Sequence, residues 1–195
     1  MPDTGAPWNI PYVASSDLVS DWPTDSQDLA QAVADGLALS YNQVVQTVKT
    51  DTFSTTSNTF TPVTGLSASI TPAATSSKVL IIAQVSFSLE TTASVGHFRL
   101  AGGNAGDYVG DAASGRIRGV FAFRNMSDDQ YYSTTPGVMV YLDSPATAAS
   151  VTYSVETMSS SVTAGTVYVN ISGRDFADDR GMRSASSITL IEVPA

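Results

Sequence analysis

Cysteine is absent from this 195-residue chain, and histidine occurs only once, as His97. The lack of cysteine excludes disulfides, thiol nucleophiles and thiolate metal sites together. One imidazole cannot supply several ligands of a histidine metal centre, and a Ser–His–acid site would have to be built around His97 itself. No nucleophile motif lies near it. We therefore interpret His97 as a surface or interface residue, and we expect neither enzymatic activity nor a cofactor.

Positive charge and long apolar runs are also scarce. Nine Lys and Arg stand against eighteen Asp and Glu, which gives a net charge of −9. Because nucleic-acid binding draws on clustered cations, we do not expect a nucleic-acid partner. The longest apolar run, Val79 to Ala83, is too short to cross a bilayer. We expect no membrane insertion and no secretory signal, and the lack of cysteine favours assembly in a reducing cytoplasm.

Charged residues make up only 14% of the chain, against roughly 25% in ordinary soluble domains. Serine and threonine take their place, and these residues suit the outward face of a strand better than a helix surface. From about Val44 onward, apolar and polar residues alternate as in half-buried strands. The predicted strands are 66–71, 78–89, 98–101, 116–124, 137–142, 150–158, 166–171 and 187–193.

This pattern favours a mainly β fold, an antiparallel β-sandwich of jelly-roll-like type over residues 44–195. Segment 78–89 is the best candidate for the central core strand. It begins apolar on both faces and ends alternating, which predicts a solvated face at its far end.

Residues 1–43 have a different character and form a separate region in this interpretation. Four prolines break the first 23 residues, which favours an extended arm. A short helix should follow, with Thr24 as its N-cap, Gln27 as capping-box partner and an end near Leu39. The arm can dock on a partner or fold back on its own domain, and its aromatic residues favour docking. The predicted anchor residues are Trp8, Ile10, Tyr12, Trp22, Leu29 and Val33.

Three arginines of the predicted strand 116–124 should project to one side. They are Arg116, Arg118 and Arg124. An arginine-bearing face in an acidic protein indicates a partner, either the acidic loops of a neighbouring copy or a charged glycan or lipid. Contact between subunits is the interpretation we favour.

One acidic cluster, Asp175, Asp178 and Asp179, lies in a predicted loop. Clustered carboxylates can bind calcium. However, Arg174 and Arg180 flank the cluster, and its spacing matches no EF-hand loop. Salt bridges within the loop are therefore the favoured interpretation, with calcium as the alternative.

Three stretches carry a resemblance to known proteins. Residues 7–37, PWNIPYVASSDLVSDWPTDSQDLAQAVADGL, resemble the N-terminal segments of small bacteriophage fibre and virion proteins. Residues 50–89 resemble the opening strands of phage tail-fibre-like and head-decoration-like β-domains, and the closing SASSITLIEVPA resembles their last strand. The resemblance covers about half of the chain. It implies a virion component, usually a trimer with a jelly-roll-like or complement-globular-like sandwich, and it implies no catalytic residue.

The sequence therefore predicts a homotrimeric capsid decoration (cement) or head-fibre protein, held by its N-terminal arm to the major capsid protein of the same phage. The alternative is a short tail-fibre or tail-tip adhesin that docks on a tail protein and binds a host surface glycan. In both cases we expect the protein in the virion, after assembly in the bacterial host cytoplasm.

Overall fold

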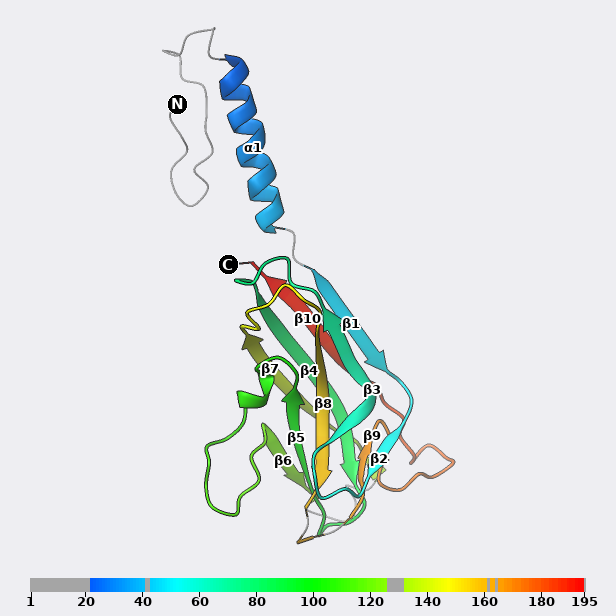
Figure 1. Ribbon diagram of the computed structural model, residues 1–195. Coiled ribbons are helices and arrows are strands. Elements are labelled where there is room, and N and C mark those ends of the chain that lie inside the picture. Colours follow the sequence, from blue (N-terminus) through cyan, green and yellow to red (C-terminus); the bar gives the residue numbers. More distant parts are fainter. Residues whose placement is uncertain (1–21, 41–42, 126–131, 161, 164, 195) are drawn as a thin grey trace. The chain divides into compact units, whose positions relative to one another are not determined.

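The computed structural model describes residues 22–40, 43–125, 132–160, 162–163 and 165–194. The chain divides between Asn42 and Gln43 into two units. The first contains one helix, α1, and the second is a β-domain built from two antiparallel sheets (Figure 1). The predicted β-sandwich is thus confirmed.

Helix α1 spans Trp22–Ser40. It begins two residues before the expected N-cap, so Thr24 lies inside the first turn rather than at the cap. Proline explains the difference, because Pro23 lacks an N–H and has a φ suited to the first helical turn. Its 19 residues make a rod of about 28 Å, so the helix is longer than expected. Among the described residues, no helix is long and apolar enough to cross a membrane.

The first sheet has β4 (Lys78–Leu89) at its centre. Strand β7 (Thr135–Asp143) pairs with one edge of β4. On the other edge, β10 (Ser186–Val193) pairs with the first part of β4 and β9 (Val167–Val169) with the last part. Outside these lie β1 (Val44–Lys49), paired with β10, and β2 (Phe53–Thr55), paired with β9. The central position predicted for segment 78–89 is confirmed, with the same bounds.

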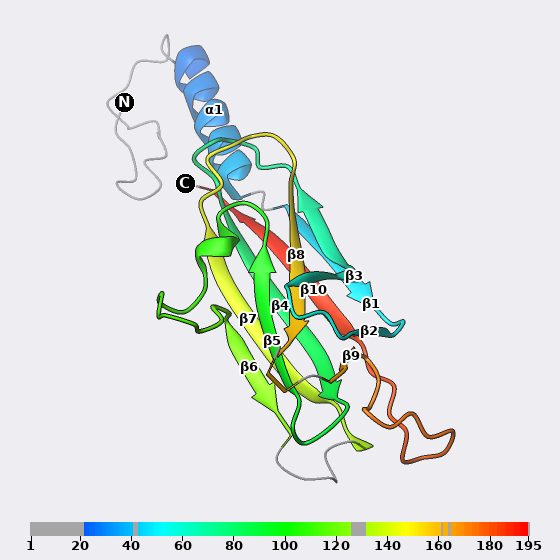
Figure 2. The same cartoon turned by 60° about the horizontal axis from the view of Figure 1, so that its bottom comes forward.

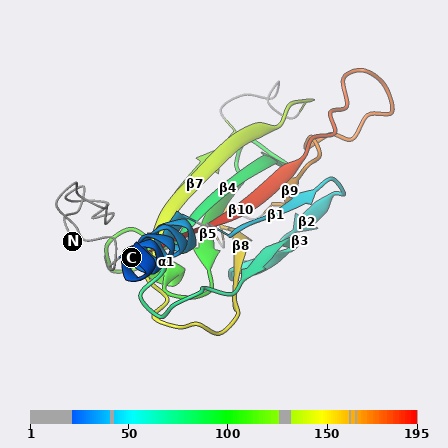
Figure 3. The same cartoon turned by 90° about the horizontal axis from the view of Figure 1, so that it is seen from above.

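The second sheet has the order β3–β8–β5–β6. Its strands are β3 (Thr61–Ile70), β8 (Val151–Ser159), β5 (Val95–Ala101) and β6 (Phe121–Arg124). Figure 3, seen from above, shows β7, β4 and β10 on one side of the domain and β5 and β8 on the other. An aromatic cluster lies between the two sheets: the Phe87 ring lies 4.7 Å from that of Phe98, 5.7 Å from Phe121 and 5.1 Å from Phe123.

The burial of β4 runs opposite to the expectation. Its first half alternates, whereas Ser86 to Leu89 are all buried. The segment after β9 covers this end: the Asn170 N–H donates to the Ser86 carbonyl at 2.8 Å, and Gly173 approaches the Leu89 carbonyl closely. The alternating pattern predicts that Ser86 and Ser88 face solvent, but a segment about 80 residues later in the chain covers both of them.

The predicted strand 116–124 is also corrected. Only Phe121–Arg124 is a strand, and residues 102–120 form a long connection that contains the short 3-10 helix η2 (Ala105–Asp107). Glycines explain the loss of extended structure. Gly115 has φ +70°, and Gly110 donates its N–H to the Gly119 carbonyl at 3.2 Å, which closes the connection on itself.

The strand registers fix which loops share an end of the β-domain. Val44 pairs with Ile191 and Lys78 with Val193, so the chain enters beside the end of its last strand. We call this the near end. The opposite, far end carries four connections, whose described residues are 90–94, 125 with 132–134, 160 with 162–163 and 165–166, and 170–185. Figure 2 brings this end forward, with the 170–185 loop in orange.

Candidate functional site

The predicted anchor is described only in part. Trp8, Ile10 and Tyr12 lie outside the described residues, and Trp22 is the first residue of α1. Leu29 and Val33 lie four residues apart on α1 and share one helix face. Both side chains are exposed, at 39% and 43%. The helix thus presents a short apolar stripe, and its role in docking stays a prediction.

The three arginines do not share a strand face. Arg116 and Arg118 lie in the 102–120 connection, and only Arg124 belongs to β6. All three are exposed. Arg118 Nε donates to the Gly110 carbonyl at 2.8 Å, and Arg124 Nε donates to the Thr92 carbonyl at 2.9 Å. Two of the three therefore stabilise loops, and their predicted contact with a neighbouring copy or a glycan stays a prediction.

The acidic cluster forms salt bridges at the far end. Arg180 pairs with Asp178 at 2.5 Å, as expected. The partner of Asp175 is Arg183 rather than Arg174, at 2.7 Å. The hydrogen bond from Arg180 lowers the pKa of Asp178 below its usual value. No group of three His, Cys, Asp or Glu side chains arranged for a metal ion occurs in the described part of the chain.

An aromatic stack accompanies these ion pairs. The rings of Tyr132 and Phe176 lie 5.5 Å apart and nearly parallel, and the Arg180 guanidinium lies 4.6 Å from the centre of the Phe176 ring. Both rings are half-buried and the guanidinium is exposed, so the stack presents aromatic surface and a cation side by side, where a ligand can contact both. The sequence held part of the signal, since Phe176 and Arg180 lie within the same acidic segment, but Tyr132 is distant in the chain.

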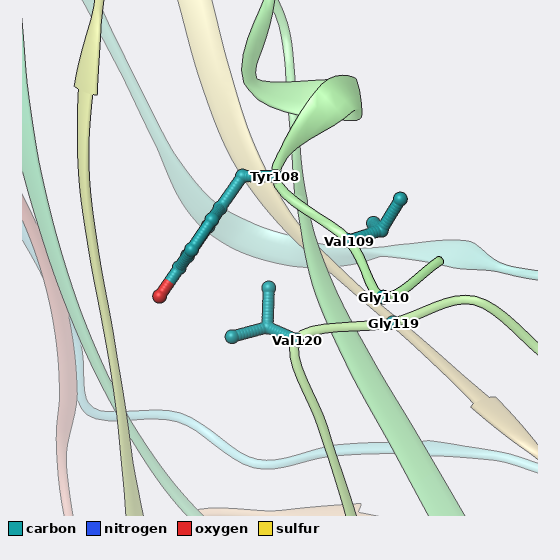
Figure 4. Close-up of a pocket in the computed structure, with 5 residues that line it drawn as sticks. All are labelled: Tyr108, Val109, Gly110, Gly119 and Val120. Carbon is teal, nitrogen blue, oxygen red and sulfur yellow. The ribbon is translucent and has the colours of Figure 1, made fainter. Parts of the chain in front are cut away.

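A hollow of about 270 Å³ lies beside the 102–120 connection. Its lining residues are Tyr108, Val109, Gly110, Gly119 and Val120 (Figure 4). Tyr108 and Val120 point to the same side of the connection, whereas Val109 points away. The Tyr108 ring stacks on that of Tyr141, at 5.0 Å between ring centres. The lining offers one phenol and no carboxylate, amine or imidazole, which suits packing better than chemistry.

A buried carboxylate lies near this hollow, at the near end of the β-domain. Asp143 of β7 is fully buried. Its Oδ2 accepts hydrogen bonds from the Tyr153 hydroxyl at 2.6 Å and from the Asn104 N–H at 3.1 Å. Burial is the main cause of the raised pKa of Tyr153, and the hydrogen bond to Asp143 adds to it. The pair joins the two sheets and carries no nucleophile, so its role is structural.

His97 lies on β5 with its side chain half-buried. Burial lowers the pKa of its imidazole below the usual value, so the ring is neutral at pH 7. The position agrees with the surface interpretation of His97. Its lack of a catalytic role stays a prediction.

Comparisons with known proteins assign no function to this chain. No protein-family model matches the chain, and no curated protein matches it. One similar solved structure comes from the Gx strain of infectious bursal disease virus, at 16% identity and a TM-score of 0.35. The matched region covers 80% of this chain and 37% of the viral chain. Another is the VP2 subviral particle of infectious bursal disease virus, at 14% identity and a TM-score of 0.34, covering 79% and 38%.

The chain therefore spans less than two fifths of either matched protein. At this level of similarity, neither relative assigns a function or an assembly to it.

Proposed function

We propose that this chain is a structural, non-enzymatic component of a bacteriophage particle. In this proposal it is a homotrimeric capsid decoration or head-fibre protein, assembled in the host cytoplasm and held to the shell by residues 1–43. The resemblance of residues 7–37 and 50–89 to phage virion proteins supports the phage assignment.

The observation that carries the proposal is that the two ends of the β-domain differ. The chain enters at the near end, directly after the predicted anchor, while four connections gather at the far end. A module of this kind can be attached through the segment before Gln43 without covering its far-end loops. That arrangement fits a protein that is fixed to a surface at one end and presents loops at the other.

The apolar stripe of α1 gives the anchor a second support. Leu29 and Val33 are exposed although a solvated helix normally carries polar residues on every exposed face. About two fifths of each side chain is still open to solvent, so complete burial in a docked state would contribute roughly 1 kcal/mol each. The stripe is too short to form a coiled coil without further contacts.

The test is incorporation into particles. The full chain should join particles, and a chain that starts at Gln43 should fold but remain in the soluble fraction. A double variant, Leu29→Asp with Val33→Asp, should reduce incorporation strongly. Ala34→Asp is the matched control, because Ala34 is exposed on another side of α1, and it should incorporate normally. Normal incorporation of the truncated chain would refute the anchor.

The far-end stack favours the second candidate, a tail-fibre or tail-tip adhesin. Tyr132, Phe176 and Arg180 would then contact a host surface glycan. Copy number separates the two roles: hundreds of copies per particle indicate decoration, and a few tens or fewer indicate the tail. Under the adhesin role, Phe176→Ala should reduce adsorption to host cells without reducing incorporation.

A further inference from the structure

The outer faces of the two sheets differ in chemistry. The outer face of β3–β8–β5–β6 is polar: Ser69 and Thr152 share a hydrogen bond of 2.7 Å between neighbouring strands. On the same face Arg99 pairs with Glu156 at 2.7 Å, and its guanidinium lies 4.1 Å from the centre of the Phe60 ring. This face is built for contact with water.

The outer face of the other sheet is apolar and continuous across four strands. We call it the apolar face. Its register places Leu142, Leu80, Ile191 and Val44 in one row, side by side on β7, β4, β10 and β1. The full set is Val44, Gln46, Val48, Lys78, Leu80, Ile82, Gln84, Pro136, Val138, Val140, Leu142, Ser187, Thr189, Ile191 and Val193.

Lys78 is the one charged member of this set, although the chain has 27 charged residues (9 Lys and Arg plus 18 Asp and Glu). Five aliphatic side chains on its edge strands β1 and β7 are exposed to solvent: Val44, Val48, Val138, Val140 and Leu142. Their exposed fractions run from 46% for Leu142 to 60% for Val44. A soluble sheet with one free face normally places polar residues there, so a face of this composition indicates that something covers it.

The size of the apolar face limits what can cover it. With strands about 4.8 Å apart and same-face residues about 6.7 Å apart, these positions cover roughly 450 Å². A standard interface buries about 800 Å² on each partner. Contact through this face alone is therefore reversible, and it needs a partner at high local concentration. Further copies of the same chain on one assembly meet that condition.

Charge points to the same occupant. Two copies that each carry −9 repel one another wherever acidic surfaces meet. The apolar face carries no carboxylate, and its one cation, Lys78, is exposed at the near-end edge, so copies can approach without bringing carboxylates together or burying a charge at the centre of the contact. An anionic lipid or nucleic acid would instead need clustered cations, and this face has only Lys78.

We propose that the apolar face is the surface through which copies of this chain contact one another. The choice of a second copy as partner rests in part on the proposed function, but association in solution can be measured whether or not the chain joins a particle. It also differs from the arginine contact predicted from the sequence. Leu142, Leu80, Ile191 and Val44 form its most apolar row, so contact between copies should centre there.

The experiment is sedimentation of the full chain from about 10 µM to about 1 mM, the range where weak contacts of this size appear. The mass of the wild-type protein should rise with concentration above the 20.3 kDa of one copy. Val140→Asp should keep it at one copy, because it places a charge in the apolar face. Gln84→Glu should do the same with almost no change of shape, which guards against a folding defect in the first variant.

Val162→Asp is the matched control. Val162 lies at the far end, is 89% exposed and stands outside the apolar face, so this variant should associate like the wild type. Because the chain has no cysteine, a single Val140→Cys variant should also give a covalent dimer with a short thiol cross-linker, and Val162→Cys should not. A wild-type protein that stays monomeric at the highest concentration would overturn the proposal. Association that survives both charged variants of the face would overturn it as well.

Discussion

Tyr153 of β8 donates a 2.6 Å hydrogen bond to Oδ2 of Asp143 on β7, and thereby joins the two sheets of the sandwich at their buried near end. Both side chains are fully buried. Gly103 lies against both of them, with φ +51°, and this conformation brings the Asn104 N–H to the same carboxylate oxygen. The connection after β5 thus helps to satisfy a charge that would otherwise be isolated in the core.

Removal of the Tyr153 hydroxyl should destabilise the domain. Tyr153→Phe leaves Asp143 with a lost donor in a buried site, and we expect a loss of about 1–3 kcal/mol in the free energy of unfolding. Urea unfolding followed by far-UV circular dichroism measures this loss of stability. Tyr168→Phe, at a half-exposed tyrosine of β9, is the matched control and should change stability by less than about 0.5 kcal/mol. Equal effects at the two tyrosines would contradict the inter-sheet role.

Gly103 should not tolerate a side chain. A Cβ there would collide with Asp143 Oδ2 and the Tyr153 hydroxyl, in a backbone conformation that L-residues rarely adopt. Gly103→Ala should therefore cost about 2–4 kcal/mol. Gly106, three residues away, has open space around its Cβ position, so Gly106→Ala should leave the thermal midpoint nearly unchanged. A tolerant Gly103 would show that this connection packs differently.

Asn170 connects three separate segments. Its side-chain amide donates to the carbonyls of Lys49 and Asp51 at 2.8 and 3.0 Å, and its Oδ1 accepts from the Ser186 hydroxyl at 2.6 Å. Asn170→Asp keeps the shape and the tolerance of a positive φ (+64°) but removes both donors. We expect a loss of about 2–4 kcal/mol, measured by urea unfolding. The exposed Asn58 provides the control, and Asn58→Asp should be nearly neutral.

Stability should also fall as the pH drops from 7 toward 5. Burial lowers the pKa of His97 in the folded state, so the unfolded chain binds more protons in this range. The contribution of the neutral His97 imidazole to the free energy of unfolding is therefore fully present above the usual pKa of 6.5. It declines as the pH falls toward the lower pKa of the folded state. Among the described residues, the other groups with a lowered pKa are carboxylates, which act at lower pH. His97→Gln should flatten the slope, and an unchanged slope would contradict the assignment.

The sequence predicted those features that depend on local pattern. Segment 78–89 was identified to the residue, because turn residues bound it and its apolar content is continuous. The Asp178–Arg180 pair was also expected, since only Asp179 separates its members. By contrast, Asp175 pairs with Arg183 because the loop folds back and brings them together. Their spacing in the sequence alone did not indicate this pair.

Features that depend on the placement of the sheets were not predictable. Asp143 and Tyr153 lie ten residues apart, but their contact requires β7 and β8 to belong to different sheets. The apolar face also depends on how the two sheets are placed. Residues 137–142 are apolar at nearly every position, so the sequence predicts a strand without showing that Val138 and Val140 face solvent.

The central claim is that this chain is a particle component attached through the segment before Gln43. Its most direct test is quantitative mass spectrometry of purified phage particles assembled with either the full chain or the chain that starts at Gln43. We predict that the full chain is present in a fixed number of copies per particle and that the shortened chain, although folded, is absent. Equal amounts of both in the particles, or neither of them, would contradict the claim.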